Sequence, residues 1–380
     1  MPGRGYILFH PDAAQALPTA LLDIAALMGE MWKAYPSSLS HFMTAHGILP
    51  DHELEGLFRD GTVSADRPPA EGQIQPASID LRLGSKAFRL RASFLPGATR
   101  SVTSRLDDDL VMHTVDLSSG AVLETGCVYL VPLQESLNLP AGISAAMNPK
   151  SSTGRIDVFT RVITDQGVAF DQAPEGYSGP LYAEVSPRTF SILAREGDRL
   201  SQIRFRKGAH QPVRDVTVSV DLQGFEGGIV GYRARRHAGL VDLARIGEHK
   251  RDRYWEPLQA PDGQLVLDPG EFYILASQEA VSIGLGEAAE MAPIATEIGE
   301  FRAHYAGFFD PGFGVSETGG SGSRAVLEVR GRDVPFILEH GQPIARLVYE
   351  PMLEAPSKAY GAVASNYQAQ GLKLSKFFTS

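Results

Sequence analysis

The sequence predicts an all-β protein made of two tandem domains of the sandwich or barrel type, with a few short helices. Short runs rich in Val, Ile, Leu, Phe and Tyr recur along the chain. Gly, Pro, Asp or Asn interrupts them at intervals of about eight to twelve residues, which is typical of short strands joined by turns. The chain has 380 residues, of which 43% are hydrophobic, so it is long enough to bury two separate cores.

An internal repeat supports the two-domain prediction. The stretch from Val122 to Leu130 (VLETGCVYL) returns from Val266 to Ile274 (VLDPGEFYI), 144 positions later. The same offset relates further segments of the two halves, namely Ala183 to Val185 and Leu327 to Val329, Gly197 and Gly341, and Leu200 to Phe205 and Ile344 to Tyr349. Self-similarity at a fixed offset indicates that one structural unit has been duplicated.

The repeat sets the expected domain boundaries. We place the first domain at residues 47–213 and the second at residues 214–356. Residues 1–46 precede the repeat and are expected to be an extension that is helical or poorly ordered, with apolar residues at helical spacing over 19–35. Residues 357–380 have no sustained strand pattern and are expected to be a mobile C-terminal lid or tail.

Two segments depart from the strand pattern. Residues 50–60 predict a short helix because Leu54, Leu57 and Phe58 fall at helical spacing. Residues 233–253 are rich in charged side chains, and we expect them to be a solvated loop of the second domain.

Asp80 and Arg82 lie two residues apart in the predicted strand SIDLRLG. Side chains two apart on a strand share a face, so we expect a structural ion pair between them. Asp242, in GLVDL, is a weaker echo of this motif in the second copy.

Charge and cysteine content exclude several classes of protein. The formal net charge of −10 provides no positive field for DNA or RNA, and no basic patch stands out. Cys127 is the only cysteine, which excludes a disulfide framework and favours a reducing compartment, so we expect the cytoplasm. No run of eighteen apolar residues occurs, and we expect no membrane span.

The segment from Lys150 to Arg155 (KSSTGR) concentrates two cations and three hydroxyl groups in six residues. Such a segment can surround a triphosphate with charge-assisted hydrogen bonds. Taken alone, it is a weak signal, because a polar turn with a solvated Lys and Arg occurs in most proteins.

Glu184 lies between apolar neighbours in the predicted strand LYAEV. A carboxylate in this setting indicates a structural ion pair or a group used in proton transfer, unless the strand is at an edge and the side chain faces solvent.

The order of three motifs along the first domain resembles the dCTP deaminases of the dUTPase-like superfamily, in a double-length form. These motifs are QPASIDLRLG (75–84), KSSTGR (150–155) and GPLYAE (179–184). The resemblance implies two dUTPase-like domains of the β-clip, distorted jelly-roll type. It also implies hydrolytic removal of ammonia from cytosine C4 of dCTP, which yields dUTP for dUMP and dTTP synthesis.

The resemblance also implies roles for individual residues. Glu184 corresponds to the general base and acid, and Ser151 and Arg155 to residues that orient the attacking water. The expected substrate-binding residues are Lys150, Ser152, Thr153, Asp171 as the sugar-binding carboxylate, Tyr182, Ala183, Gln202, and Tyr367 and Gln370 of the tail.

The second copy keeps only part of this pattern. Glu328 stands at the position of Glu184, and the hairpin around Asp310 (AGFFDPGFG) resembles the sugar-recognition hairpin of the family better than the first copy does. The phosphate loop is replaced by IATEIG (294–299), which has no cation and contains Glu297. Asp310 and Glu328 are therefore further candidates, but this copy lacks a complete site of its own.

The resemblance implies Mg²⁺ bound through the substrate triphosphate rather than by a protein cage. Zinc is not expected, because zinc-dependent deaminases need His-x-Glu and Pro-Cys-x-x-Cys, and the chain has one cysteine and no His-x-Glu. Family members are trimers with sites between subunits, so we expect dCTP as the small-molecule partner and a homo-oligomer whose sites pair unlike domains.

Two alternatives remain open. One is a dUTP diphosphatase, or a bifunctional enzyme that makes dUMP from dCTP, although the chain lacks the Arg-Gly-x-x-Gly-Phe-Gly-Ser motif of dUTPases. The other is an inactive nucleotide-sensing protein, which the degenerate second copy favours and the intact first copy opposes.

Overall fold

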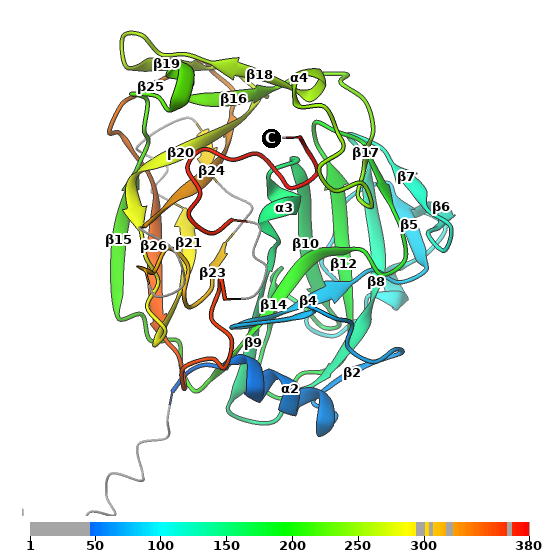
Figure 1. Cartoon of the computed structure of the whole chain (residues 1–380). Helices are drawn as coiled ribbons and strands as arrows, with labels where there is room; N and C mark the ends of the chain where they lie inside the picture. Colours follow the sequence, from blue (N-terminus) through cyan, green and yellow to red (C-terminus); the bar gives the residue numbers. More distant parts are fainter. Residues whose placement is uncertain (1–45, 294–300, 304–306, 317–321, 363–366, 380) are drawn as a thin grey trace, which may run out of the picture. The chain divides into compact units, whose positions relative to one another are not determined.

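The computed structural model describes residues 46–293, 301–303, 307–316, 322–362 and 367–379. Ala45–Ser380 form one compact unit. Strands dominate this unit, so the all-β prediction is confirmed (Figure 1). The expected N-terminal extension, with its helix at 19–35, and the degenerate loop at 294–299 lie outside the described residues.

The first domain is built on two sheets with a shared core. One sheet has the order β11-β9-β14-β4-β3, with β1 paired to β14. Its strands are β1 (Gly47–Ile48), β3 (Ile74–Gln75), β4 (Ser78–Arg82), β9 (Ile143–Pro149), β11 (Gln172–Ala173) and β14 (Arg199–Lys207). The other has the order β10-β12-β8-β5-β6, with β2 paired to β8. Its strands are β2 (Val63–Ala65), β5 (Lys86–Leu90), β6 (Val111–Asp116), β8 (Val128–Asn138), β10 (Val158–Thr164) and β12 (Ser178–Pro187).

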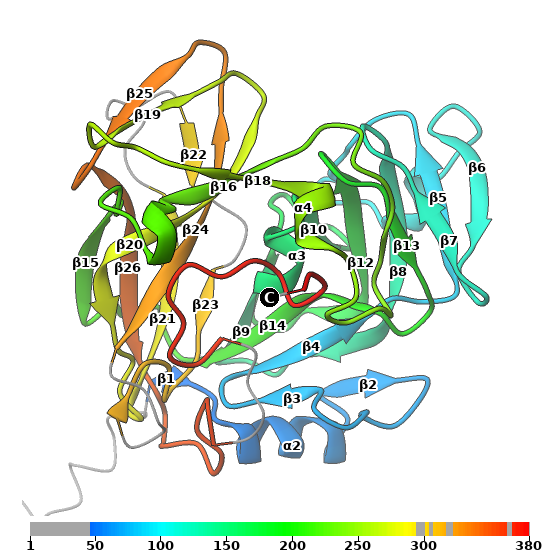
Figure 2. The same ribbon diagram turned by 45° about the horizontal axis from the view of Figure 1, so that its top comes forward.

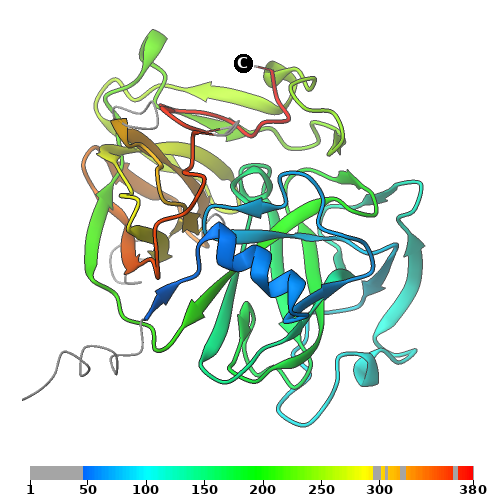
Figure 3. The same ribbon diagram turned by 60° about the horizontal axis from the view of Figure 1, so that its bottom comes forward.

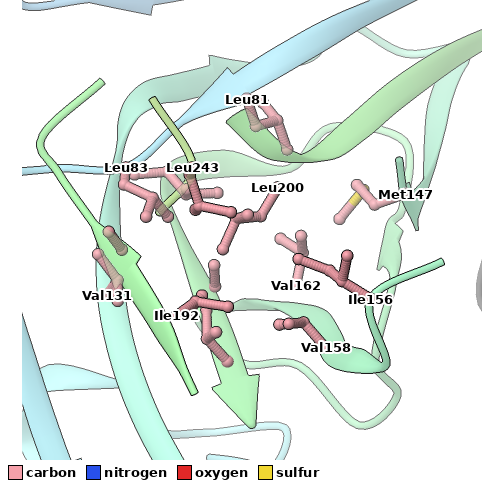
Figure 4. Packing of buried hydrophobic residues seen from close by; sticks show 14 of the residues in the cluster. Leu81, Leu83, Val131, Met147, Ile156, Val158, Val162, Ile192, Leu200 and Leu243 are labelled. Carbon is pink, nitrogen blue, oxygen red and sulfur yellow. The ribbon is translucent and has the colours of Figure 1, made fainter. Parts of the chain in front are cut away.

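Smaller elements complete this domain. A third sheet, β17-β13-β7, joins β7 (Ala121–Leu123), β13 (Ile192–Ala194) and β17 (Val241–Asp242), of which β17 comes from the second domain. The helices are α2 (Asp51–Arg59), the 3₁₀ turn η2 (Thr103–Arg105) and the single turn α3 (Ser151–Gly154). Apolar side chains of both large sheets, including Leu81, Met147, Val131 and Val162, meet in one core (Figure 4).

The second domain repeats the plan. One sheet has the order β15-β26-β21-β23, with strands β15 (Arg214–Ser219), β21 (Glu287–Pro293), β23 (Phe308–Phe309) and β26 (Pro343–Pro351). Another has the order β18-β16-β20-β24-β22, with strands β16 (Gly231–Ala234), β18 (Trp255–Leu258), β20 (Phe272–Val281), β22 (Phe301–Ala303) and β24 (Ser323–Gly331). The remaining elements are the pair β19 (Gln264–Leu267) and β25 (Phe336–Glu339), the turn η3 (Glu226–Gly228) and the helix α4 (Arg251–Tyr254).

The duplication is visible in the registers of the ladders. Ala183 of β12 lies opposite Val131 of β8, and 144 positions on Leu327 of β24 lies opposite Leu275 of β20. The β9–β14 and β21–β26 pairs repeat in the same way. Because a slip of one residue would turn every side chain to the other face, equal registers show that the two copies place equivalent residues on equivalent faces.

The predicted helix at residues 50–60 is confirmed as α2. Leu54 and Leu57 are buried, and the helix packs against β2, β3 and β4 (Figure 3, dark blue). Pro50 precedes the first turn, and the acidic Asp51 and Glu53 lie at the helix N-terminus, where the helix dipole favours negative charge.

The expected pair between Asp80 and Arg82 is wrong. Arg82 donates through Nε and its backbone N–H to the buried carboxylate of Glu135, at 2.7 and 2.8 Å. Asp80 pairs with Lys150 instead. The partners come from neighbouring strands and loops, whose reach a strand pattern does not reveal, and Asp242 likewise pairs with Arg195 of the first domain.

The prediction of a solvated loop at 233–253 is also wrong. This segment crosses to the first domain, where β17 pairs in parallel with β13. Val241 and Leu243 are buried in the core of the first domain, and Figure 4 shows Leu243 among its side chains. Charged residues at either side point outward, for example Arg245, which pairs with Glu248. The charge content of the segment therefore does not reveal its two buried apolar residues.

The C-terminal tail, expected to be mobile, is docked in this structure. Leu374, Phe377 and Phe378 belong to the core cluster that contains most of the first domain's buried apolar residues and also residues of the second domain such as Trp255. The Phe378 ring makes edge contacts with Phe190 and Trp255, with ring centroids 6.2 and 5.7 Å away. In Figures 1 and 2 the tail, drawn in red, passes beside α3.

In the part of the chain that the structure describes, no helix combines the length and the apolar character needed to cross a membrane.

The crossing segment predicts a stability difference between two neighbouring leucines. Leu243 is 7% exposed and Leu240 is 38% exposed. We expect Leu243→Ala to lower the free energy of unfolding by about 2–5 kcal/mol, because it leaves a cavity in the core. Leu240→Ala should change it by less than about 0.5 kcal/mol. Urea titrations of the two variants check this, and equal small effects would mean that the segment does not dock.

Candidate active site

A cavity of about 960 Å³ lies where the two domains and the tail meet. Its volume is within the range of ligand-binding pockets. The first domain contributes Lys150, Ser151, Ser152, Arg155, Arg199 and Gln202, the second domain Phe308, Phe309, Asp310, Phe313 and Val326, and the C-terminal segment Lys358, Tyr360, Tyr367, Gln370 and Lys376.

The phosphate-binding candidate KSSTGR forms a tight turn at the end of β9. Lys150 is extended, and the N–H groups of Thr153 and Gly154 donate to its carbonyl at 2.8 and 3.0 Å, which closes the single turn α3. This geometry turns Lys150, Ser151, Ser152 and Arg155 toward the cavity, whereas Thr153 is buried beneath the turn and does not line it.

The tail covers this turn. Nη1 of Arg155 donates to Oε1 of Gln370 at 3.0 Å and to the carbonyl of Lys373 at 2.9 Å. The guanidinium also lies 3.9 Å above the Tyr367 ring. Nε of Arg155 is buried and has no hydrogen-bond partner among the described residues, so the guanidinium has donor capacity left for a ligand.

Cations collect at this end of the cavity. Lys150 pairs with the buried Asp80, and Arg199 lies 3.6 Å from the same carboxylate. Burial lowers the pKa of Lys376 below its ordinary value, and the nearby Lys150 lowers it further. Lysines that repel one another favour an anionic ligand that would neutralise them.

The opposite wall carries Asp310 on a hairpin of the second domain. β23 pairs with β21 so that Phe308 faces Glu290, and Asp310 follows directly. Burial raises the pKa of Asp310 above its ordinary value, whereas Arg204, whose Nη2 donates at 3.0 Å, lowers it. The site therefore combines a cationic end with a buried, paired carboxylate.

The hairpin of the first domain differs from this one at the decisive position. β11 pairs with β9 so that Gln172 faces Ala146, the counterpart of Glu290 at the repeat offset. Gln172 thus corresponds to Phe308, and Pro174 stands where the second domain has Asp310.

Asp171 has a structural environment instead. Its backbone adopts the left-handed region, with φ of 62°, and its Oδ1 accepts a hydrogen bond from the Val162 N–H at 2.7 Å. Burial raises the pKa of Asp171 to about 7. The residue does not line the cavity.

The two repeat-related glutamates have different surroundings. Glu184 on β12 pairs with Arg161 at 2.6 Å, and the Arg161 guanidinium lies 3.5 Å above the Phe170 ring, away from the cavity. Glu328 on β24 lies two residues after Val326, which lines the cavity, so both side chains share one face of the strand. Glu328 is close enough to Tyr367 that its charge raises the pKa of that phenol, which burial raises most.

The structure thus brings together only some of the predicted residues. Those that line the cavity are Lys150, Ser151, Ser152, Arg155, Gln202, Asp310, Tyr367 and Gln370. Those that do not are Thr153, Asp171, Tyr182, Ala183, Glu184 and Glu328. Of these, Glu328 lies on the strand face that carries the cavity-lining Val326. Tyr182 and Ala183 are buried in the first domain.

Arg199, Lys358 and Tyr360 line the cavity but were not predicted. Lys358 and Tyr360 are held there because the Lys358 N–H donates to Asp51 at 3.0 Å and the Tyr360 N–H to the Pro311 carbonyl at 2.8 Å. Nothing in the linker-like sequence SKAYG indicates these contacts.

Comparison with known proteins covers both domains. Residues 45–209 match the family model of the 2'-deoxycytidine 5'-triphosphate deaminase N-terminal domain, and residues 209–378 match that of its C-terminal domain. The crystal structure of 2'-deoxycytidine 5'-triphosphate deaminase from Agrobacterium tumefaciens is 53% identical, with a TM-score of 0.78, over 82% of this chain and 100% of that chain.

More distant relatives match part of the chain. A dUMP-forming dCTP deaminase of Methanosphaera stadtmanae is 26% identical over 159 residues, which are 42% of this chain and 78% of the relative. A dCTP deaminase of Natronomonas pharaonis is 26% identical over 164 residues, which are 42% of this chain and 79% of the relative.

The environment of Asp171 predicts a pH-dependent stability difference for Asp171→Asn. The amide can still accept the Val162 hydrogen bond but carries no charge. Because the folded-state pKa of about 7 exceeds the ordinary 3.8, the folded wild type holds its proton more tightly and loses stability as the pH rises between these values.

We expect wild type and Asp171→Asn to have similar urea midpoints near pH 4, and the variant to be more stable at pH 8. Parallel midpoints across this range would contradict the assignment of Asp171 to a buried structural role.

Proposed function

Since this chain belongs to the dCTP deaminase family, we propose that it hydrolyses the amino group of dCTP in the cavity shared by its two domains. The observation that carries the proposal is that one cavity is lined both by the phosphate-loop cations of the first domain and by Asp310 and the Glu328 strand of the second domain. Each domain supplies what the other lacks.

The chemistry of the lining residues supports one orientation of the nucleotide. The triphosphate, as its magnesium complex, would bind at Lys150 and Ser152, where charge-assisted hydrogen bonds are available. The deoxyribose has one free hydroxyl group, at C3′, which suits the carboxylate of Asp310. The base would then lie toward Val326 and Glu328.

The mechanism we propose uses Glu328 as the proton carrier, without a metal on the water. Its carboxylate takes a proton from the water as the oxygen attacks C4, and delivers it to the ring N3. A second proton transfer from the new hydroxyl to the amino group lets the C4–N bond break, so that ammonia leaves and a carbonyl forms. Ser151 and Arg155 would orient the water and offset the developing charge.

Glu184 is the alternative carrier, as the resemblance of the first copy implies. Two observations weigh against it. Its Oε1 is engaged by Arg161, and its neighbour on the same strand face, Tyr182, does not line the cavity, whereas Val326 beside Glu328 does. A carboxylate bound to a guanidinium has less freedom to accept a proton from water.

The proposal also concerns which nucleotide is released. We propose that dUTP is released, with dUMP formation as the alternative, since relatives of both kinds occur. Incubation of the full chain with dCTP and Mg²⁺, followed by product analysis, tests this. Ammonia with dUTP supports the proposal, ammonia with dUMP and pyrophosphate supports the bifunctional alternative, and no ammonia supports an inactive nucleotide-binding protein.

The cellular compartment and the oligomeric state of the protein are also proposals. The single cysteine favours a reducing compartment, and we propose the cytoplasm. We also propose that the chains form a homo-oligomer, although the cavity described here already pairs unlike domains within one chain. Analytical ultracentrifugation of the active protein measures the number of chains.

Matched glutamine substitutions at the two repeat-related glutamates test the mechanism. We expect Glu328→Gln to lower kcat for dCTP by about 10²- to 10⁴-fold with little change in KM, because the amide keeps the shape but carries no proton. Glu184→Gln should retain near-normal kcat. The reverse result would assign catalysis to Glu184, and thermal unfolding of both variants checks that they are folded.

The tail contact predicts a separate effect on affinity. Gln370→Ala should raise the KM for dCTP about 10-fold, because Arg155 loses the amide that orients it, while the melting temperature stays near that of wild type. A point substitution is preferable to truncation, since Leu374 and Phe377 belong to the core. An unchanged KM would mean that the tail does not support the phosphate loop.

A further inference from the structure

Arg204 reaches from the first domain into the hairpin that carries Asp310. It lies on β14 two residues after Gln202, which lines the cavity, so both side chains share one strand face. Nη1 donates to the Ala289 carbonyl at 3.0 Å, and Nη2 donates to the Phe309 carbonyl at 3.2 Å and to Oδ1 of Asp310 at 3.0 Å. The guanidinium also lies 4.1 Å above the Phe308 ring.

The fold itself does not require an arginine here. At the repeat offset of 144, the equivalent position on β26 is Val348, and this strand forms the same ladder with β21 that β14 forms with β9. Arg204 is only 3% exposed, and burial lowers its pKa below the ordinary value. Burying a guanidinium is unfavourable unless its partners compensate. Three of its four hydrogen-bond acceptors belong to the Asp310 hairpin or to the neighbouring strand β21, and the fourth is the Ala77 carbonyl.

Arg204 also defines which oxygen of Asp310 is available. Oδ1 is bound to Arg204, whereas Oδ2 accepts no hydrogen bond from any residue that the structure describes, and Asp310 lines the cavity. The ion pair opposes the effect of burial, which raises the pKa of this carboxyl, and it fixes the direction of the second oxygen.

We propose that Arg204 is a positioning residue for deamination, which holds Asp310 so that Oδ2 of Asp310 accepts a hydrogen bond from the 3′-hydroxyl of the deoxyribose. This inference rests on the proposed function and deepens it. Recognition of the sugar in a site of the two domains would then depend on a cation of the first domain acting through a carboxylate of the second.

Arg206 provides a matched control. It lies two residues further along the same face of β14 and also crosses to the second domain, where it binds both oxygens of Glu350 at 2.6 Å. Neither Arg206 nor Glu350 lines the cavity. Substituting Arg206 therefore removes a comparable contact between the domains without touching Asp310.

The experiment compares dCTP with 2′,3′-dideoxy-CTP, which lacks the 3′-hydroxyl, for wild type, Arg204→Met, Arg204→Lys and Arg206→Met. The readout is the ratio of kcat/KM for the two nucleotides. One hydrogen bond to a charged group should give wild type a preference of about 10- to 100-fold for dCTP. In Arg204→Met the ratio should fall toward one, mainly through loss of dCTP turnover, whereas Arg206→Met should keep the wild-type ratio.

Arg204→Lys keeps the charge but loses the fork, so we expect an intermediate ratio. It carries the test if Arg204→Met does not fold. A wild-type ratio in Arg204→Met or Arg204→Lys, or an equal collapse in Arg206→Met, would overturn the inference. Wild-type protein that releases no ammonia from dCTP would instead overturn the proposed function, so the two failures are distinct.

Discussion

Ion pairs between buried charged groups of different domains help to fix how the two domains dock. Arg204 of the first domain pairs with Asp310 of the second, and Arg330 of the second pairs with Asp157 of the first, directly after the phosphate loop. Removing one partner of a buried pair leaves an uncompensated charge, which costs about 3–5 kcal/mol. The pairs therefore favour one docked arrangement, and this arrangement brings the phosphate loop to the Asp310 hairpin.

Duplication explains why each copy can lose a different part of the site. Once two copies are linked, a ligand held between them uses the phosphate loop of one copy and the hairpin of the other. The unused hairpin is then free to change, and Pro174 occupies its carboxylate position, while Glu184 is engaged by Arg161. The unused loop is also free to lose its cations, as the sequence IATEIG (294–299) has. The decayed second copy is thus compatible with an active enzyme.

Local patterns were sufficient to predict the strands, the repeat and the composition of the phosphate loop, because each depends on neighbouring residues. They were not sufficient to predict which motifs of the two domains line the same cavity. Glu184 and Glu328 lie in the similar sequences LYAEV and AVLEV, and only the tertiary contacts distinguish them. Arg204 is similarly hidden, because an arginine in a strand is normally solvated, and Leu243 was missed because its charged neighbours dominate the segment.

The arrangement of the cavity has a consequence for the role of assembly. The phosphate loop, the Asp310 hairpin and the tail that covers Arg155 all belong to one chain, and the tail is fixed by core residues such as Phe378. A ligand bound here contacts two domains that are already joined covalently, so the meeting of these two domains does not depend on protein concentration.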